Sequence, residues 1–317
     1  MPTTPHALFS EIIDYAGLFP PARLPMDKAW SCFLGHRAGG DGWLVARFVC
    51  PATWLDQLAP LLVAEAAGGP QVRVAVLGTG GDDAPTFAAA LERDLASMTA
   101  FADRVGDRAR MDVFEVKLPL LSDPAETIDY ACDALNDAGA AALTPFFEAP
   151  LLGDWQDRLA NSARAAAMAG HEIDPGRRVG LKIRCGGLDS AAVPDVEAVA
   201  AAVVACRGHE VPLKATQGLH HAFRHHDAAL GVEVHGFVNL LAATLFAREH
   251  RLDAAQVRLI VADTDPGAFT LTDRGLRWRE LEIAAAAIAS GRADGFTGFG
   301  SCSFSEPRDD LAALGWL

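Results

Sequence analysis

The chain has 317 residues, of which 50% are hydrophobic and 21% charged, with a formal net charge of −14. This composition is ordinary for a globular protein, and the lack of any basic block disfavours nucleic-acid binding through phosphate contacts. No stretch approaches the roughly 18 uninterrupted apolar residues of a membrane span, and the N-terminal segment lacks a secretion-signal pattern, so we expect a cytoplasmic protein without membrane contact.

The six cysteines are dispersed along the chain, and no two of them form a C-x-x-C pair. This spacing fits neither a zinc knuckle nor a disulfide framework. We therefore expect most of them to be small buried side chains.

From residue 43 onward, short β-rich runs alternate with longer segments that are rich in Ala and Leu at helical spacing, such as Thr86–Val105 and Val196–Cys206. Asp253 with Gln256 three residues later is a capping-box pattern that predicts a helix start. The predicted strands are Leu44–Cys50, Val72–Leu77, Asp112–Leu118, Ala142–Glu148, Val179–Arg184, Val211–Thr216, Ala268–Thr272 and Gly295–Ser301. Eight strands alternating with helices predict an α/β protein with a (β/α)8 (TIM) barrel, the alternative being an open doubly wound sheet.

Nothing in the sequence divides the chain, since it contains no Pro/Gly-rich linker and no internal repeat. We therefore expect one barrel domain over residues 1–317. Residues 1–42 precede the first predicted strand, and we expect them to be an extra N-terminal segment, a loop with DYAGLFPPA and then a helix, that packs on the barrel. If this loop covers the barrel mouth, Asp14 or Tyr15 completes the site there.

Four consecutive predicted strands separate an apolar face from a charged face, because successive residues of a strand point to opposite sides. In Val113–Leu118, for example, Glu115 and Lys117 share one side. The apolar face must meet the surrounding helices, so the charged face points into the barrel. The inward charges are Glu115, Lys117, Glu148, Lys182, Arg184 and Lys214.

Burying an isolated charge costs several kcal/mol, so these six charges must pair with each other, line a wet cavity or bind a ligand. The alternative is a purely structural ring of ion pairs. Four cations and two anions sum to +2, and a positive pocket in a protein of charge −14 indicates a small anionic metabolite as the partner.

Two strand ends carry residue types that suit chemistry on an anion. Val179–Gly187 (VGLKIRCGG) places Lys182 and Arg184 on one face before two glycines, which suits the binding of a carboxylate or phosphate, although a tight turn explains the glycines equally well. Pro212–His226 (PLKATQGLHHAFRHH) places Lys214 near the end of the sixth predicted strand. A neighbouring cation such as Lys182 lowers the pKa of an amine and makes it nucleophilic, the alternative being a Lys214 paired with Glu148.

Five histidines follow closely: His220, His221, His225, His226 and His235. Imidazoles beside a carboxylate such as Glu148 suit a divalent transition metal, and His220, His221 and His235 are the candidate ligands. His220 and His221 are otherwise candidates for acid–base catalysis, whereas a solvated loop is the favoured interpretation of the later pair.

The last predicted strand ends in Phe299–Pro307 (FGSCSFSEP), where small residues and hydroxyl groups precede a short helix. Ser301, Cys302 and Ser303 are candidates for holding a phosphate or carboxylate at the helix N-terminus, and Cys302 could also be a nucleophile. Capping of the helix is an equally good explanation for the serine and proline that follow.

Several segments resemble known proteins. DYAGLFPPA, KATQGLHHAFR, HGFVNLL and GFGSCSFSEP resemble phrases of a widespread group of bacterial proteins over nearly the whole chain, a resemblance that implies no particular activity. Over a much shorter span, LKATQGL resembles the Schiff-base strand of deoxyribose-phosphate aldolases, and VGLKIRCGG resembles their second lysine strand. This resemblance implies that Lys214 forms the carbinolamine and that Lys182 lowers its pKa.

The leading hypothesis is an enzyme, a lyase of aldolase type, that acts on a small phosphorylated or carboxylated carbonyl compound and needs no cofactor. Lys214 forms the iminium and Lys182 tunes it, with Glu115 in the same catalytic set, while Glu148 or His221 moves protons. The groups expected to hold the anion are Arg184, Lys117, Ser301, Cys302 and Ser303.

Two other hypotheses remain open from the sequence. One is a lyase, isomerase or hydrolase that depends on a divalent transition metal held by His220, His221 and His235. The other is a non-catalytic barrel that binds an anion. The apolar content is also compatible with a homo-oligomer.

Overall fold

Eight parallel strands close into a barrel in the computed structural model of the chain, which describes residues 3–65, 69–151, 153–173 and 178–317. The barrel strands are β1 (Ile13–Tyr15), β2 (Val45–Pro51), β3 (Val72–Leu77), β4 (Ala109–Lys117), β5 (Thr144–Glu148), β6 (Gly180–Arg184), β7 (Leu213–Thr216) and β13 (Phe296–Ser301). They pair in chain order, and β13 closes the ring between β7 and β1. The predicted (β/α)8 fold is confirmed, and the open sheet is not formed.

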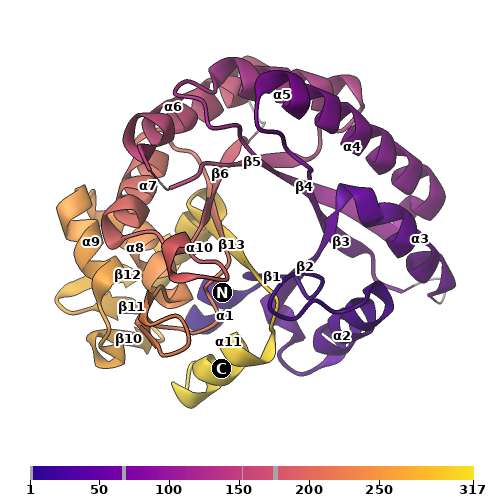
Figure 1. Ribbon diagram of the computed structural model, residues 1–317. Coiled ribbons are helices and arrows are strands. Elements are labelled where there is room, and N and C mark those ends of the chain that lie inside the picture. The colour runs from indigo at the N-terminus through magenta and orange to yellow at the C-terminus, as the bar shows by residue number, and fades with distance from the viewer. Residues whose placement is uncertain (1–2, 66–68, 152, 174–177) are drawn as a thin grey trace.

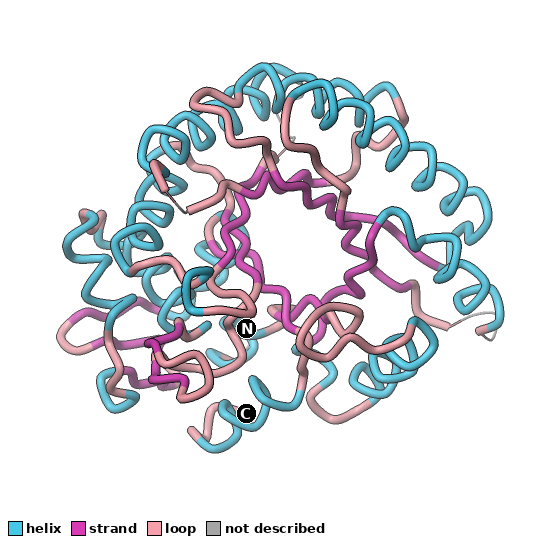
Figure 2. Tube along the Cα trace, in the orientation of Figure 1, coloured by secondary structure: helices cyan, strands magenta, loops and turns pink. Residues whose placement is uncertain are grey.

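Helices surround the ring of strands on all sides, as the view along the barrel axis shows (Figure 1, Figure 2). They are α1 (Thr4–Phe9), α2 (Met26–Ala38), α3 (Leu55–Ala64), α4 (Ala84–Val105), α5 (Ala125–Asp137), α6 (Trp155–Ile173), α7 (Val196–Gly208), α8 (Phe237–His250), α9 (Ala254–Ala262), α10 (Ala285–Asp294) and α11 (Ser305–Ala313). The predicted capping box of Asp253 and Gln256 begins α9. Among the helices of the described residues, none combines the length and apolar character that crossing a membrane requires.

The first barrel strand was missed in the prediction, and the seventh predicted strand was wrongly assigned to the barrel. Residues 1–42 are not an extra segment on the barrel, because Ile13–Tyr15 forms β1 inside the ring, hydrogen-bonded to β13 and β2. The strand has only three residues, Ile-Asp-Tyr, which is too few for a β pattern to stand out in the sequence.

The predicted strand Ala268–Thr272 is β-structure, but it lies outside the barrel. It corresponds to β10 (Phe269–Thr272), which joins β11 (Gly275–Trp278) and β12 (Leu281–Ala284) in an antiparallel sheet. A further two-stranded sheet of β8 (His225–Asp227) and β9 (Val232–Val234) follows β7. Both small sheets are insertions before the last barrel strand.

The predicted strand parity is confirmed by the packing. Phe114 and Val116 of β4 belong to the main apolar core between barrel and helices. Val113, on the side of Glu115, belongs instead to a second apolar cluster with Phe146 and small side chains of neighbouring strands. Polar and apolar side chains therefore share the barrel interior.

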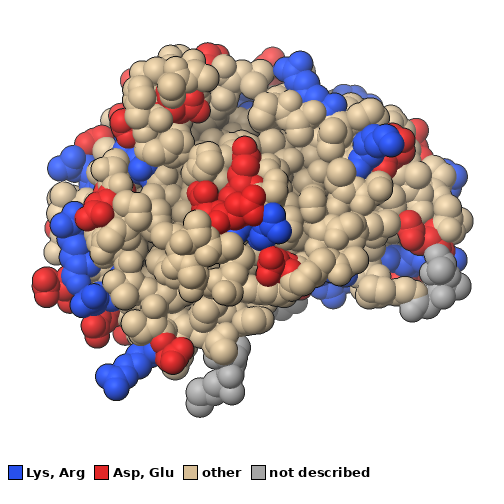
Figure 3. Space-filling view, turned by 90° about the horizontal axis from the view of Figure 1, so that it is seen from below, with Lys and Arg blue, Asp and Glu red and all other residues tan. Residues whose placement is uncertain are grey.

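The side of the molecule on which α2 and α11 lie in Figure 1 shows acidic and basic side chains interspersed within a larger neutral area (Figure 3). The two chain ends lie on this side as well, and the Trp316 ring stacks on that of Phe9 at 6.1 Å between centroids. The first and last helices thus cover neighbouring parts of the barrel.

If β1 is an integral barrel strand, shortening a side chain on it must destabilise the fold. Ile13 is fully buried, so we expect Ile13→Ala to lower the free energy of unfolding by about 2–5 kcal/mol in urea titrations. Leu120→Ala is the control, because Leu120 is 65% exposed and its truncation should change stability by about 0.5 kcal/mol or less. Equal, small effects of the two substitutions would contradict this placement of β1.

Candidate functional site

The pairing of the strands places four charged residues side by side around the barrel wall. Lys117 of β4 is the register partner of Glu148 on β5, which pairs in turn with Lys182 on β6 and then with Lys214 on β7. The sequence contains four lysines in all, so three of the four stand in this one row.

The inward-facing side chains form one continuous chain of ion pairs, called here the interior ion-pair chain. The Lys214 ammonium contacts Asp14, and its Nζ lies 2.7 Å from Oε1 of Glu115. The other oxygen of Glu115 lies 3.0 Å from Nζ of Lys182, which is also 3.0 Å from Oε2 of Glu148. Arg184 closes the series with 2.8 Å between Nη2 and Oε1 of Glu148. Carboxylates and cations therefore alternate from Asp14 to Arg184.

Most of this chain is removed from solvent. Asp14, Glu115, Glu148, Lys182 and Lys214 are each at most 6% exposed, and each touches at least one opposite charge. Pairing of this kind is what makes buried charges tolerable. From the sequence, the inward charges were expected to pair with each other, line a wet cavity or bind a ligand. The structure shows that they pair with each other.

The pKa shifts follow from this alternation. Burial by itself raises the pKa of Glu115, but the ammonium groups of Lys214 and Lys182 outweigh it and hold that pKa at about 2. Burial opposes a charged Lys182, yet attraction by Glu115 and Glu148 raises its pKa above the ordinary value. Lys182 does not touch Lys214 directly, because Glu115 lies between the two ammonium groups.

A second set of ion pairs, absent from the sequence-based predictions, extends the chain toward the N-terminal ends of the strands. Arg47 of β2 lies 3.3 Å from Oδ1 of Asp14 and 2.7 Å from Oδ1 of Asp112 on β4. Arg73 of β3 approaches the same Asp112 to 2.7 Å and also pairs with Glu11. A lone charge within an apolar strand, as in the segment around Arg47, is the signal that could have revealed this set.

Asp14 reaches the site from the strand itself and not from a covering loop. It faces Lys214 inside the barrel, whereas Tyr15 packs outward against Phe33 and Phe48. Only Asp14 of these two neighbours therefore joins the interior ion-pair chain.

The net positive charge of the predicted set lies at the rim of the barrel. The four buried members, Glu115, Glu148, Lys182 and Lys214, sum to zero, so the +2 comes from Lys117 and Arg184. Lys117 is exposed at the end of β4, and the Arg184 side chain is 44% exposed. An anion would meet these two cations first.

The glycines after β6 hold two strand exits close together. A side-chain carbon on Gly186 would lie 2.8 Å from the Cα of Gly218, which itself has a φ of +70°. This close approach accounts for Gly186 and Gly218 as packing residues, which is the turn explanation that the sequence left open.

The Ser301–Ser303 turn satisfies its own polar groups. The Ser301 hydroxyl donates to the carbonyl of Ser303 at 2.6 Å, and the Ser303 hydroxyl accepts from the backbone N–H of Glu306 at 3.3 Å. Cys302, between them, faces His220, with 3.9 Å between Sγ and Nε2. The turn thus works in part as the N-terminal cap of α11.

The three candidate metal ligands have separate partners. His220 pairs with Glu306, His221 with Asp310, and buried His235 lies 2.8 Å through Nε2 from the carbonyl oxygen of Pro194. In the described ranges no group of three or more His, Cys, Asp or Glu side chains is arranged to hold a metal ion. The three histidines therefore do not form the cluster that the metal hypothesis requires.

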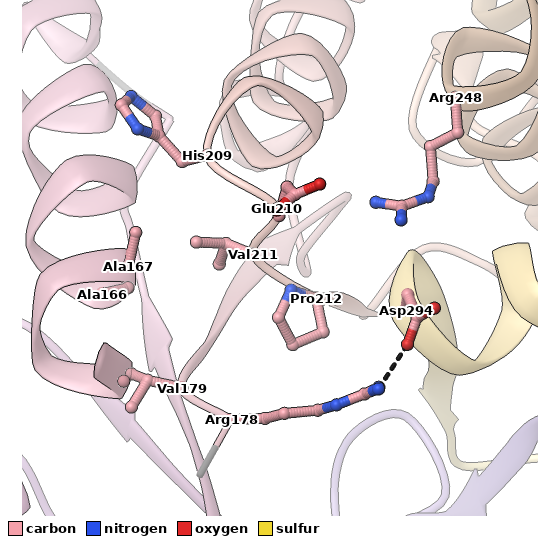
Figure 4. Close-up of a pocket in the computed structure, with 11 residues that line it drawn as sticks. Ala166, Ala167, Arg178, Val179, His209, Glu210, Val211, Pro212, Arg248 and Asp294 are labelled. Carbon is pink, nitrogen blue, oxygen red and sulfur yellow. Dashed lines mark hydrogen bonds and ion pairs between the residues drawn. The ribbon is translucent and has the colours of Figure 1, made fainter. Parts of the chain in front are cut away.

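A separate pocket of about 270 Å³ lies at the opposite, N-terminal end of the strands (Figure 4). Its lining includes Val179 and Val211, just before β6 and β7, and the ion pair between Arg178 and Asp294. None of the predicted site residues lines it, so it is not connected with the interior ion-pair chain.

The depressed pKa of Glu115 predicts a contribution to acid stability. A carboxylate with a lowered folded-state pKa stabilises the fold above its ordinary pKa near 4.5, and that stability is lost as the pH falls toward 2. We expect Glu115→Gln to flatten the decline of unfolding free energy over this window, measured by urea titration at successive pH values.

Glu115→Gln leaves Lys214 with Asp14 and Lys182 with Glu148, so its cost at neutral pH should stay below the roughly 3–5 kcal/mol of a stranded buried charge. Glu126→Gln on the exposed start of α5 is the control and should keep the slope of the unmodified protein. A slope unchanged by Glu115→Gln would show that this carboxylate is not held ionised by the two lysines.

Comparison with known proteins supports the fold. No protein-family model matches the chain, and no curated protein matches it. Among solved structures, the chain is similar to the deoxyribose phosphate aldolase from Aeropyrum pernix, described as having a unique tetrameric structure, with a TM-score of 0.51 and 12% sequence identity. The match covers 98% of this chain and 93% of that one. The likeness shows that the chain shares the barrel fold of that aldolase over nearly its whole length.

Proposed function

We propose that the protein is a lyase of aldolase type that acts on a small anionic carbonyl compound through a Schiff base on Lys214. The observation that carries the proposal is a fully buried lysine at the centre of the barrel, in contact with Asp14 and Glu115. Similarity of fold to an aldolase is consistent with it.

The use of lysine at these positions supports a chemical role. Only four of the 27 Lys and Arg residues are lysines, and three of these stand in one register row across the barrel wall, on β4, β6 and β7. An ion pair alone is served as well by arginine, which stays protonated, whereas a lysine can lose its proton and attack a carbonyl carbon.

A carboxylate beside Lys214 can accept the proton of its ammonium group. Asp14 and Glu115 both contact the ammonium group, and because two ammonium groups hold the pKa of Glu115 at about 2, we propose Asp14 as the proton acceptor when the amine becomes nucleophilic. Lys182 contacts the second oxygen of Glu115 and so maintains the position of that carboxylate. In this proposal Lys182 affects the reactivity of the Lys214 amine through Glu115, which lies between the two side chains, and not by direct contact.

Lys117 and Arg184 at the rim bind the anionic group of the substrate, as a point charge and as a planar fork of donors. The hydroxyl groups of Ser301 and Ser303 form hydrogen bonds within their own turn. We therefore propose that the two cations, and not these hydroxyl groups, bind the anion. The substrate then reaches Lys214 with its carbonyl group pointing into the barrel.

The proposed reaction is balanced without a cofactor. The Lys214 amine adds to the carbonyl carbon, water leaves, and the resulting iminium accepts the electron pair of the adjacent carbon–carbon bond as that bond breaks. The hydroxyl proton of the departing aldehyde passes to a base, for which we propose Glu148 or His221. Protonation of the enamine and hydrolysis return the free lysine. The Aeropyrum pernix enzyme is tetrameric by its description, and we propose a homo-oligomer here too.

Borohydride trapping tests the nucleophile. The protein is incubated with pyruvate, glyoxylate or glycolaldehyde phosphate, reduced with borohydride and mapped by peptide mass spectrometry. We expect a reduced adduct on the peptide that contains Lys214, since reduction fixes an iminium covalently.

The Lys214→Met variant should lose this adduct, whereas Lys28→Met, at an exposed position of α2, should be trapped like the unmodified protein. An adduct found only on Lys28 or the N-terminal amine, or one that persists in Lys214→Met, would contradict the proposal.

A further inference from the structure

A second pocket, of about 390 Å³, lies outside the barrel wall near the C-terminal end of β1. Tyr15, which points away from the interior, and His36 of α2 line it together with His220, Cys302 and Glu306. Asp14 and Lys214 lie on the inner side of the same wall, so this pocket is separate from the interior ion-pair chain.

Three of its residues form a line of contacts. The Cys302 sulfur lies 3.9 Å from Nε2 of His220, and Nδ1 of the same ring lies 2.8 Å from Oε2 of Glu306. They come from three segments: the end of β13, the loop after β7 and the first turn of α11. One imidazole nitrogen thus meets a thiol and the other a carboxylate, which is the arrangement of an activated nucleophile, its base and the group that orients the base.

The imidazole beside the sulfur carries a positive charge. The hydrogen bond with Cys302 is the largest influence on His220 and, with Glu306, outweighs burial, so the pKa of His220 rises to about 9. His220 is therefore an imidazolium at neutral pH. Cys302 also precedes the N-terminus of α11, whose backbone dipoles favour a negative charge.

The other titratable groups of the pocket stay neutral and do not compete for this role. Burial lowers the pKa of His36, with a further effect from Arg308, and burial raises the pKa of Tyr15. Cys185 and Cys206 differ from Cys302 in their surroundings, because no imidazole contact is described for them, and burial alone raises their pKa values to about 12.

We propose that Cys302, His220 and Glu306 form a second reactive site, in which Cys302 is a nucleophile for the carbonyl carbon of a small electrophilic ligand held in this pocket. The Sγ–carbon bond forms as the carbonyl π bond opens, and the oxygen takes the proton of the His220 imidazolium. Where the ligand carries a leaving group, the hydroxyl proton returns to His220 as the carbonyl re-forms, the departing group takes that proton, and an acyl-thioester remains on Cys302. Glu306 is a positioning residue that holds the imidazole. The site acts independently of Lys214.

Competitive alkylation tests the thiol without any lyase substrate. At about pH 6, well below the ordinary thiol pKa near 8.5, unactivated cysteines are almost wholly protonated. We expect limiting iodoacetamide to label Cys302 about tenfold faster than Cys32, the exposed cysteine of α2 that serves as internal reference. With p-nitrophenyl acetate we expect a burst of one equivalent of p-nitrophenolate and an acetyl group on the Cys302 peptide.

The His220→Gln variant keeps much of the side-chain volume and should remove the advantage of Cys302 over Cys32. Buried Cys185 and Cys206 should stay unlabelled, which reports an intact fold. Glu306→Gln should shift the pH profile of Cys302 labelling toward that of Cys32. Equal rates for the two cysteines in the unmodified protein, or a Cys302 rate that His220→Gln leaves unchanged, would overturn the proposal.

Discussion

The interior of this barrel depends on one constraint, which is that every charge removed from water must touch an opposite charge. Glu115 meets that constraint for two strands at once, since each of its oxygens contacts a different lysine. Asp14 does the same between Lys214 and Arg47. The apolar residues of the interior fill the space that these pairs leave, and the surplus positive charge remains at the rim.

The fold was largely predictable because its signal is repeated many times. Seven of the eight predicted strands lie in the barrel in their predicted order, and strand parity separated the helix-facing side from the interior. β1 was not predicted because it has only three residues, Ile13 to Tyr15, which is too few for a β pattern to stand out in the sequence. The strand at Phe269–Thr272 was assigned to the barrel because local β propensity does not distinguish parallel from antiparallel partners.

The candidate site was predictable in composition but not in connectivity. Parity alone placed Glu115, Glu148, Lys182 and Lys214 on one face. It could not show that Glu115 separates the two lysines, because that depends on how far each side chain reaches across the barrel. The pairing of His220 with Cys302 and Glu306 depends on segments 82 and 86 residues apart, which only the closed fold brings together.

Two consecutive residues of β1 mark the boundary between the proposed sites. Asp14 turns inward to Lys214, and Tyr15 turns outward to the pocket of Cys302. The two proposed nucleophiles, Lys214 and Cys302, therefore lie on opposite sides of one strand. Lys214 contacts Asp14 and Glu115, whereas Cys302 contacts His220, so the two share no partner.

The central claim is that the contact between Lys214 and Asp14 serves the chemistry proposed at Lys214 and not the stability of the fold. Its most direct test is the free energy of unfolding of the double variant Asp14→Leu/Lys214→Met, which removes one anion and one cation. Arg47 keeps Asp112 and Glu115 keeps Lys182, so no buried charge is stranded. Because apolar replacement of a buried ion pair is often neutral or stabilising, we expect a stability within about 1 kcal/mol of the unmodified protein, or above it. A loss of several kcal/mol would show that the pair serves the fold, and would contradict the claim.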